Sequence, residues 1–221
     1  KVYANVNEIT FHSTKLYDFS LSKKKIFSLD KSNFLFIRQD PPYDMAYVTS
    51  LHLLELLNNK VKVVNDPIGI RNSPEKLLML KFQEIIPSTI VTRSIDEVDR
   101  FTQKFSKSVI KPIYGNGGES VFLLDRNDKN FNQIIESFLD NSKEPFIVQE
   151  YLSEINNGDK RIIIINGKPI AAIKRMPKKN EIRSNIHVGG TAVSTKLNRN
   201  DLKICHTIKN ELLDNKLFFV G

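Results

Sequence analysis

The most informative stretch of this chain is Val109-Ile110-Lys111-Pro112, then Tyr114-Gly115-Asn116-Gly117-Gly118-Glu119, then Ser120-Val121-Phe122-Leu123-Leu124. Two apolar runs joined by a glycine-rich loop predict a β-hairpin. Glycine lets backbone amides come close to an anion, and several N–H groups in a row form a concave anion site. Because Lys111 places a cation at its base, this loop is predicted to fold over the phosphates of a nucleotide.

Taken alone, the same loop is more typical of a plain hairpin turn. The glycines are not followed by Gly-Lys-Ser/Thr at P-loop spacing, and a strand rather than a helix comes after them, unlike the Rossmann fingerprint. Downstream residues favour the phosphate interpretation. The apolar strand Pro145–Val148 runs into Gln149-Glu150-Tyr151-Leu152, and Gly158-Asp159-Lys160-Arg161 opens a second strand. Asn166-Gly167 predicts a tight hairpin turn before a return strand that ends at Met176.

In this order the motifs resemble the ATP-grasp ligases and, among them, prokaryotic-type glutathione synthetase. The resemblance is collinear from about Arg38 to Gly221 and rests on Arg38-Gln39-Asp40-Pro41-Pro42-Tyr43-Asp44, Asn65-Asp66-Pro67, Ile70-Arg71-Asn72, Pro74-Glu75-Lys76-Leu77, Ile110-Lys111-Pro112 with Gly115 to Gly118, Asn157-Gly158-Asp159-Lys160-Arg161, Arg175-Met176-Pro177, Arg183-Ser184-Asn185 and Gly189-Gly190. It implies an α/β chain in which an ATP-grasp fold of two α+β lobes follows a partial parallel-sheet pre-ATP-grasp domain. The expected division is 1–72, 73–148 and 149–221.

The resemblance also implies the role of individual residues. ATP would be bound by Lys76, Lys111, Gly115, Asn116, Gly117 and Gly118, with the adenine against Gln149, Glu150, Tyr151 and Leu152. The peptide substrate would be held by Arg38, Arg161, Arg175, Arg183, Asn185, Gly189 and Gly190. Arg161 and Arg175 are expected to be catalytic, because planar guanidinium groups pair with carboxylate and phosphoryl oxygens. Residues 177–191 are expected to be either a lid or an ordinary exposed linker.

Patterns along the rest of the chain predict further elements. The first 30 residues look irregular, whereas Phe34–Ile37, a helix over 45–57 and Val61–Val64 predict a parallel β-α-β unit. Ser73 is predicted to cap a helix whose first residue is Pro74. The sequence Ser94-Ile95-Asp96-Glu97 matches a capping box for a helix that reaches about Phe105, and another helix is expected over 131–139.

The implied reaction joins γ-glutamylcysteine to glycine through an acyl phosphate formed from ATP. Such phosphoryl transfer needs Mg²⁺ with hard oxygen ligands. The family places those ligands, an Asp and a Glu-x-Asn strand, just after the segment that matches Leu217–Gly221, so no residue here is assigned to the metal. We therefore expect the chain to be truncated at both ends and residues 1–221 alone to be incomplete for catalysis. The open alternatives are another ATP-grasp amino-acid ligase and a non-catalytic nucleotide-binding fragment.

Composition sets the outer limits. The 221 residues carry a formal charge of +8, but the lysines are scattered, which argues against a nucleic-acid groove. No apolar stretch is long enough to span a membrane. The single cysteine, Cys205, fits a reducing cytoplasm and lies in a helical pattern typical of a packed side chain. The expected partners are small-molecule substrates, and the resemblance implies a homo-oligomer.

Overall fold

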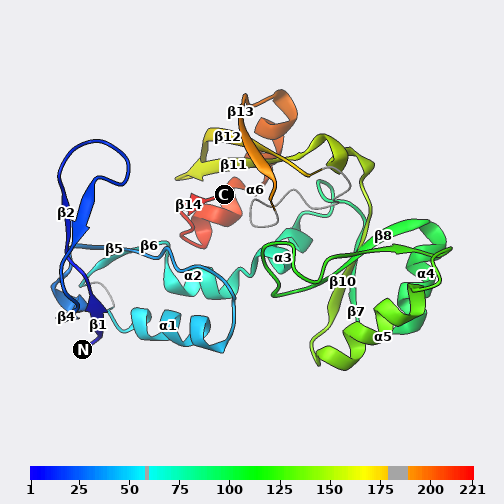
Figure 1. The fold of residues 1–221 in the computed structure, drawn as a ribbon, viewed down its shortest axis with the longest axis horizontal. Coiled ribbons are helices and arrows are strands. Elements are labelled where there is room, and N and C mark those ends of the chain that lie inside the picture. Colours follow the sequence, from blue (N-terminus) through cyan, green and yellow to red (C-terminus); the bar gives the residue numbers. More distant parts are fainter. Residues whose placement is uncertain (58–59, 179–188) are drawn as a thin grey trace.

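The computed structural model describes residues 1–57, 60–178 and 189–221 (Figure 1). Contrary to the expectation of an irregular start, the first 30 residues contain four strands. β1 (Tyr3–Val6) pairs antiparallel with β4 (Lys25–Ser28), and β2 (Ile9–Phe11) pairs with β3 (Phe19–Leu21). The strands are three or four residues long, and their residues are exposed or only half-buried, so no buried face marks them in the sequence.

A parallel β-α-β unit follows, as predicted. The short 3₁₀ turn η1 (Leu29–Lys31) leads into β5 (Phe34–Phe36), which pairs in parallel with β6 (Lys62–Val64). Helix α1 (Met45–Glu55) connects the two strands. Helix α1 begins at Met45 because the carboxylate of Asp44 accepts a hydrogen bond from the Tyr47 amide at 2.8 Å. Buried Val2, Leu57 and Val61 form the core of this part.

Two short helices lead out of the unit, and here the predicted cap is wrong. α2 (Pro67–Asn72) is capped by Asp66, whose carboxylate accepts from the Ile68 and Gly69 amides. Ser73 ends α2 instead of starting the next helix, and its buried hydroxyl has no hydrogen-bond partner among the described residues. α3 (Glu75–Leu78) therefore starts after Pro74, and the 3₁₀ turn η2 (Met79–Lys81) continues it.

The next part is a four-stranded antiparallel sheet with two helices on one face. In chain order it contains β7 (Thr89–Thr92), α4 (Ile95–Lys104), β8 (Lys107–Pro112), β9 (Phe122–Asp125), α5 (Phe131–Asn141) and β10 (Phe146–Glu150), and the strand order is β7-β10-β8-β9. The predicted β8–β9 hairpin is confirmed, with Ile110 opposite Phe122. Ile110, Val148 and Phe146 pack with Val98 of α4 and Ile135 of α5. Because side chains alternate along a strand, Lys111, Ile147 and Gln149 lie on the opposite face.

Ser94 caps α4 as predicted, but the capping box is only half formed. The Ser94 hydroxyl accepts from the Glu97 amide. The Glu97 carboxylate, however, accepts from the Thr92 hydroxyl, and that hydroxyl in turn accepts from the Ser94 amide at 2.9 Å. Thr92 thus stands between the two groups that a capping box would join directly.

The last part is a second antiparallel sheet, in the order β13-β12-β11-β14. It consists of β11 (Asp159–Ile165), β12 (Lys168–Met176), β13 (Thr191–Thr195) and β14 (Phe219–Val220), with η3 (Ser153–Asn157) before it and α6 (Arg199–Asp214) packed on one face. Asn166 and Gly167 have φ of 49° and 71°, as the predicted tight turn requires. Cys205 of α6 is buried against Ile164 and Leu212, so the prediction of a packed cysteine is confirmed.

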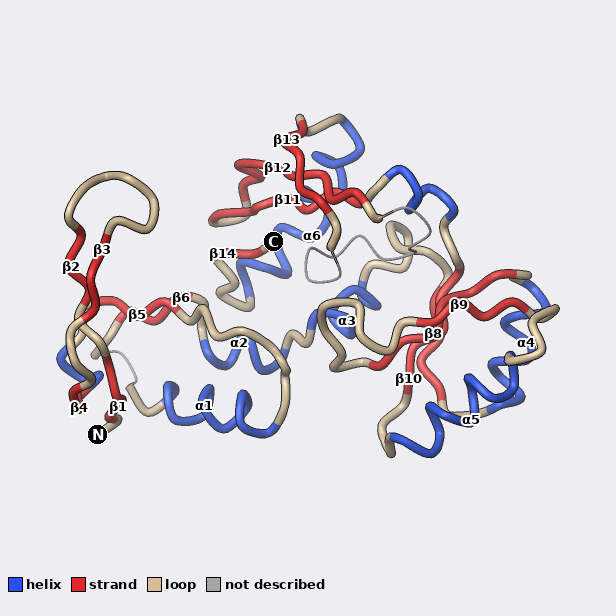
Figure 2. The backbone as a smooth tube through the Cα atoms, in the orientation of Figure 1, coloured by secondary structure: helices blue, strands red, loops and turns tan. Residues whose placement is uncertain are grey.

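The N-terminal unit is joined to the second sheet by backbone-like contacts. The Asn65 side chain donates to the Phe219 carbonyl at 2.8 Å and accepts from the Phe219 amide at 2.7 Å. Ile70 of α2 and Leu78 of α3 pack into the core around Ile164 and Leu212. In the tube view α3 lies between α2 and the sheet that contains β8, β9 and β10 (Figure 2). No helix in the described ranges is both long and apolar enough to cross a membrane.

Candidate active site

Helix α3 delivers Lys76 to the base of the glycine-rich loop. Its ammonium group donates to the carbonyl oxygens of Pro112 at 2.6 Å and Gly115 at 2.8 Å. Burial, and then the nearby Lys111 cation, lower the pKa of Lys76 to about 8. Lys76 is therefore an incompletely compensated cation under the loop, and an anion bound there would stabilise its charged form.

Lys111 lies at the end of β8, on the face of the sheet that α4 and α5 leave uncovered. Its ammonium group donates to the side-chain oxygen of Gln149 at 2.8 Å, and the Gln149 nitrogen donates to the Thr89 hydroxyl at 2.8 Å. Burial lowers the pKa of Lys111, and Glu75 partly offsets this. The pattern of single strands does not reveal the Lys111–Gln149–Thr89 chain, because it arises only when β7, β10 and β8 pair.

The loop between β8 and β9 has a backbone that glycine makes accessible. Gly117 and Gly118 have φ of 61° and 85°, and the Glu119 amide donates to the Asn116 carbonyl at 3.0 Å. An added Cβ at Gly117 would touch nothing within 4 Å, so the conformation rather than lack of space calls for glycine there. The predicted Gly115, Asn116, Gly117 and Gly118 are thus gathered in one turn beside Lys76.

The segment predicted to hold adenine, Gln149 to Leu152, begins in the last two residues of β10 and continues beyond it. The Glu150 amide donates to the Ser88 carbonyl at 2.9 Å, and the Tyr151 amide donates to the Lys107 carbonyl at 3.2 Å. These two amides are used inside the sheet. The amides of Glu150 and Tyr151 are therefore not available to bind a base.

Arg161 and Arg175 lie on the same face of the second sheet, opposite α6. The register places Arg161 across from Ile173, two residues from Arg175. Arg175 makes a bidentate pair with Asp159, in which Nε donates to Oδ1 at 2.8 Å and Nη2 donates to Oδ2. That pair uses two of the five guanidinium N–H groups of Arg175, whereas Arg161 is exposed. Sequence reasoning missed Asp159, although it opens the same strand.

The other residues predicted to bind the peptide lie in several places. Arg38 follows β5 closely, as expected, and its guanidinium carbon lies 4.8 Å from the centre of the Phe219 ring. Gly189 and Gly190 precede β13, and a Cβ added to Gly189 would meet the Lys178 side chain. Arg183 and Asn185, together with most of the predicted lid, lie outside the described residues.

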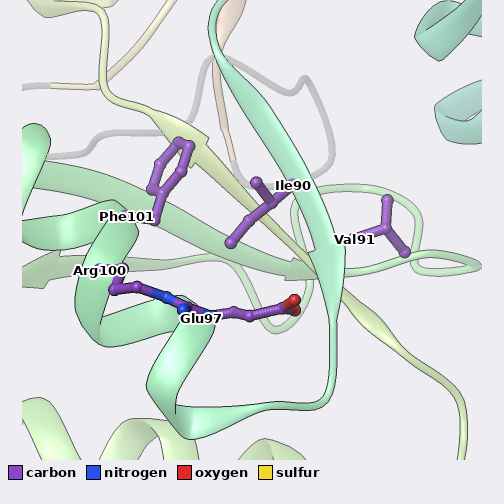
Figure 3. Close-up of a pocket in the computed structure, with 5 residues that line it drawn as sticks. All are labelled: Ile90, Val91, Glu97, Arg100 and Phe101. Atoms are coloured by element: carbon purple, nitrogen blue, oxygen red, sulfur yellow. The ribbon is translucent and has the colours of Figure 1, made fainter.

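A depression of about 460 Å³ between β7 and α4 lies away from these residues (Figure 3). It is lined by Ile90, Val91, Glu97, Arg100 and Phe101, and none of these is a predicted site residue. Within residues 1–57, 60–178 and 189–221, no three His, Cys, Asp or Glu side chains come together in a way that could hold a metal ion.

Comparisons with known proteins agree with this arrangement. Residues 1–71 match the family model for the prokaryotic glutathione synthetase N-terminal domain, and residues 75–221 match that for the prokaryotic glutathione synthetase ATP-grasp domain. The glutathione synthetase of Agrobacterium fabrum (strain C58 / ATCC 33970) is 42% identical over 221 residues, which are 100% of this chain and 69% of that protein.

Two solved structures share the fold at low sequence identity. D-cycloserine synthetase DcsG superimposes with a TM-score of 0.63 at 14% identity, over 88% of this chain and 70% of that chain. The ATP-grasp ligase PsnB, in a complex with minimal precursor, Mg and ADP, gives a TM-score of 0.56 at 14% identity, over 96% of this chain and 70% of that chain. The predicted α/β architecture with an ATP-grasp fold is thereby confirmed, and the chain belongs to the prokaryotic glutathione synthetase family.

Proposed function

We propose that this protein is the ATP-dependent ligase that makes glutathione from γ-glutamylcysteine and glycine, with release of ADP and phosphate. Membership of the family supports the reaction. The structural observation that carries the proposal is the pair Lys76 and Lys111, two partly buried cations of lowered pKa beneath a glycine-rich loop. Such a pair is suited to the triphosphate of ATP, because several negative oxygens offset the cost of holding two cations together.

The chemistry requires activation, since a free carboxylate is a poor electrophile. In the first step a carboxylate oxygen of the dipeptide attacks the γ-phosphorus of ATP, the bond to the bridging oxygen breaks, and ADP leaves. In the second step the glycine amine attacks the acyl carbon, phosphate leaves with its bonding electrons, and the nitrogen loses a proton. The protein mainly has to position the reactants and stabilise negative charge.

The described residues can share this work. Lys76, Lys111 and the amides of Gly115 to Gly118 would hold the phosphates, and the segment from Gln149 to Leu152 would face the base. Arg161 would meet the transferring phosphoryl group or the peptide carboxylate with its exposed guanidinium. Arg175, held by Asp159, would present its remaining N–H groups. Arg38 would bind the peptide from the N-terminal unit, and Arg183, Asn185, Gly189 and Gly190 would complete the peptide site.

Mg²⁺ belongs to the proposal as the companion of ATP, and PsnB is a relative in fold whose complex contains Mg and ADP. The described residues provide no cluster that fits the ion, so we assign it no ligands and derive no step through it. The division at 72/73 and 148/149, a cytoplasmic location and a homo-oligomeric state remain predictions.

A phosphate-release assay tests the proposal. With ATP and Mg²⁺, the purified full-length protein should release phosphate when γ-glutamylcysteine and glycine are both present, and mass spectrometry should find glutathione. Lys111→Met should lower kcat/KM by about 100-fold or more, because one phosphate-neutralising charge is lost. The exposed Lys129→Met is the matched control and should act like wild type. Release with D-alanine pairs or with glutamate and a peptide instead would favour a different ATP-grasp ligase. Nucleotide binding without release in any mixture would favour a non-catalytic role.

A further inference from the structure

Tyr114 and Tyr43 form a contact that none of the site assignments above uses. Tyr114 is the residue directly before the glycines of the loop, and Tyr43 belongs to the segment Arg38–Asp44 of the N-terminal unit. Their rings are stacked, with centroids 5.7 Å apart and planes 21° from parallel. The loop proposed to cover ATP therefore touches the segment proposed to bind the peptide, although the two are about 70 residues apart in sequence.

Tyr43 is the anchored member of this pair. Its hydroxyl donates to the Arg71 carbonyl at 2.8 Å, and its ring also packs on Tyr47 of α1 with centroids 5.2 Å apart. Arg71 is itself ion-paired with Glu55 of α1. Burial, followed by the neighbouring Tyr114 and Tyr47, raises the pKa of Tyr43.

Tyr114 is held from the other side by the nucleotide residues. The two carbonyls that receive the Lys76 ammonium group, Pro112 and Gly115, flank Tyr114 in sequence. Lys76 and the stack on Tyr43 therefore both restrain this end of the loop. The position of Tyr114 thus depends on one contact from the nucleotide site and one from the peptide segment.

We propose that Tyr114 and Tyr43 are positioning residues that couple peptide binding to nucleotide binding. A peptide bound at Arg38 further restrains the segment that carries Tyr43, on whose ring Tyr114 rests, and this lowers the cost of ordering the glycine loop over ATP. By linkage, ATP must strengthen peptide binding by the same factor. The inference rests on the proposed function, since it takes γ-glutamylcysteine as the ligand of Arg38–Asp44.

Equilibrium binding of a non-hydrolysable ATP analogue to the full-length protein tests the coupling. In wild type, saturating γ-glutamylcysteine should raise the affinity for the analogue by about threefold to tenfold. One aromatic pair can supply a free energy of this size. Tyr114→Leu should bring this factor close to one, whereas Tyr114→Phe keeps the ring and should retain it. The affinity for the analogue alone is measured in both variants as well, because the stack already exists without ligands and the coupling factor is the ratio of the affinities with and without γ-glutamylcysteine.

Further variants separate the stack from a general loss of structure. Tyr43→Leu removes the stack from the other side, and Tyr43→Leu with Tyr114→Leu should lose no more coupling than either change alone. Tyr17→Leu changes a tyrosine that is 88% exposed in the β2–β3 connection and should leave the factor unchanged. If Tyr114→Leu unfolds, Tyr43→Leu carries the test.

Two results would overturn the inference. One is a wild-type protein that makes glutathione but shows a coupling factor of one. The other is a Tyr114→Leu variant that keeps the wild-type factor. A wild-type protein that binds ATP yet releases no phosphate with γ-glutamylcysteine and glycine would instead overturn the proposed function on which the inference rests.

Discussion

Lys76 and Lys111 show how burial prepares a side chain for a ligand. In a short helix such as α3, a lysine in the first turn opposes the helix dipole and gains nothing from it. Lys76 instead donates to two loop carbonyls, which satisfy its N–H groups without neutralising its charge. Lys111 is satisfied by a neutral amide in the same way. Each cation is kept in place but left without a full counter-charge, and ATP would supply that charge.

The affinity for an ATP analogue should therefore fall with rising pH. Because burial lowers the pKa of Lys76 to about 8, the lysine loses its proton above that pH, and binding must then restore it. One such proton weakens binding by about tenfold between pH 7 and pH 9. Lys111, whose pKa is also lowered, acts in the same direction, whereas Glu75 opposes both shifts.

Isothermal titration calorimetry at several pH values measures this dependence. Lys76→Arg is the informative variant, because a guanidinium group stays charged throughout the range and should flatten the profile. A wild-type affinity that does not change from pH 7 to pH 9 would show that Lys76 does not titrate against the nucleotide.

Asp159 is predicted to act through Arg175. Asp159→Asn removes the charge that holds the guanidinium fork while keeping the size of the side chain. We expect kcat/KM to fall by roughly tenfold, with much of the effect in KM for the dipeptide. Asp140→Asn on the exposed end of α5 is the matched control. Equal kinetics for both variants would remove Asp159 from the site.

One side chain, that of Asn65, holds elements from different parts of the chain together by hydrogen bonds to backbone groups. Asn65 follows β6 and pairs with both backbone groups of Phe219 in β14, as a neighbouring strand would. Close by, a Cβ on Gly69 of α2 would lie 1.9 Å from the Asn215 carbonyl oxygen, so the two backbones approach directly. These contacts set the orientation of the N-terminal unit and hence the place of Arg38.

Asn65→Ala should destabilise the protein by about 1–3 kcal/mol, because the Phe219 amide and carbonyl lose their partner in a half-buried place. Chemical denaturation measures the change. Asn127→Ala, on the exposed turn before α5, is expected to cost less than about 0.5 kcal/mol. An Asn65→Ala variant as stable as Asn127→Ala would show that water replaces the asparagine without loss.

Across the molecule, stability should depend on the nucleotide as well as on the hydrophobic clusters formed by the described residues. Lys76 and Lys111 come from different elements and meet only in the folded chain, so an ATP analogue binds the native state in preference to the unfolded chain. At about 100 times its dissociation constant it should raise the free energy of unfolding by about 2.7 kcal/mol.

Thermal unfolding with and without the analogue measures this stabilisation. Lys111→Met should lose most of it at the same analogue concentration, and Lys129→Met should keep it. A Lys111→Met protein that is stabilised as much as wild type would place the triphosphate elsewhere.

Much of the fold was predictable because it depends on local patterns. Apolar runs and turn residues predicted the β8–β9 hairpin, the Asn166-Gly167 turn and the parallel β5–β6 unit. The four initial strands escaped prediction because exposed strands have no buried face to set a period. Ser73 was misassigned because a serine before a proline can stand at the end of one helix or at the start of the next. Only the folded chain shows that α2 extends to Asn72, so that Ser73 follows its last residue.

Lys111 and the glycine loop were predicted as a site from residue type and turn chemistry, which act over a few neighbouring residues, whereas the role of Lys76 was predicted from the resemblance of its motif. The partners of those residues were not. Gln149 reaches Lys111, Asp159 holds Arg175, and Tyr43 stacks on Tyr114 because strand register and domain packing bring together residues far apart in sequence. Burial, which lowers the pKa of both lysines, likewise exists only once these elements have packed.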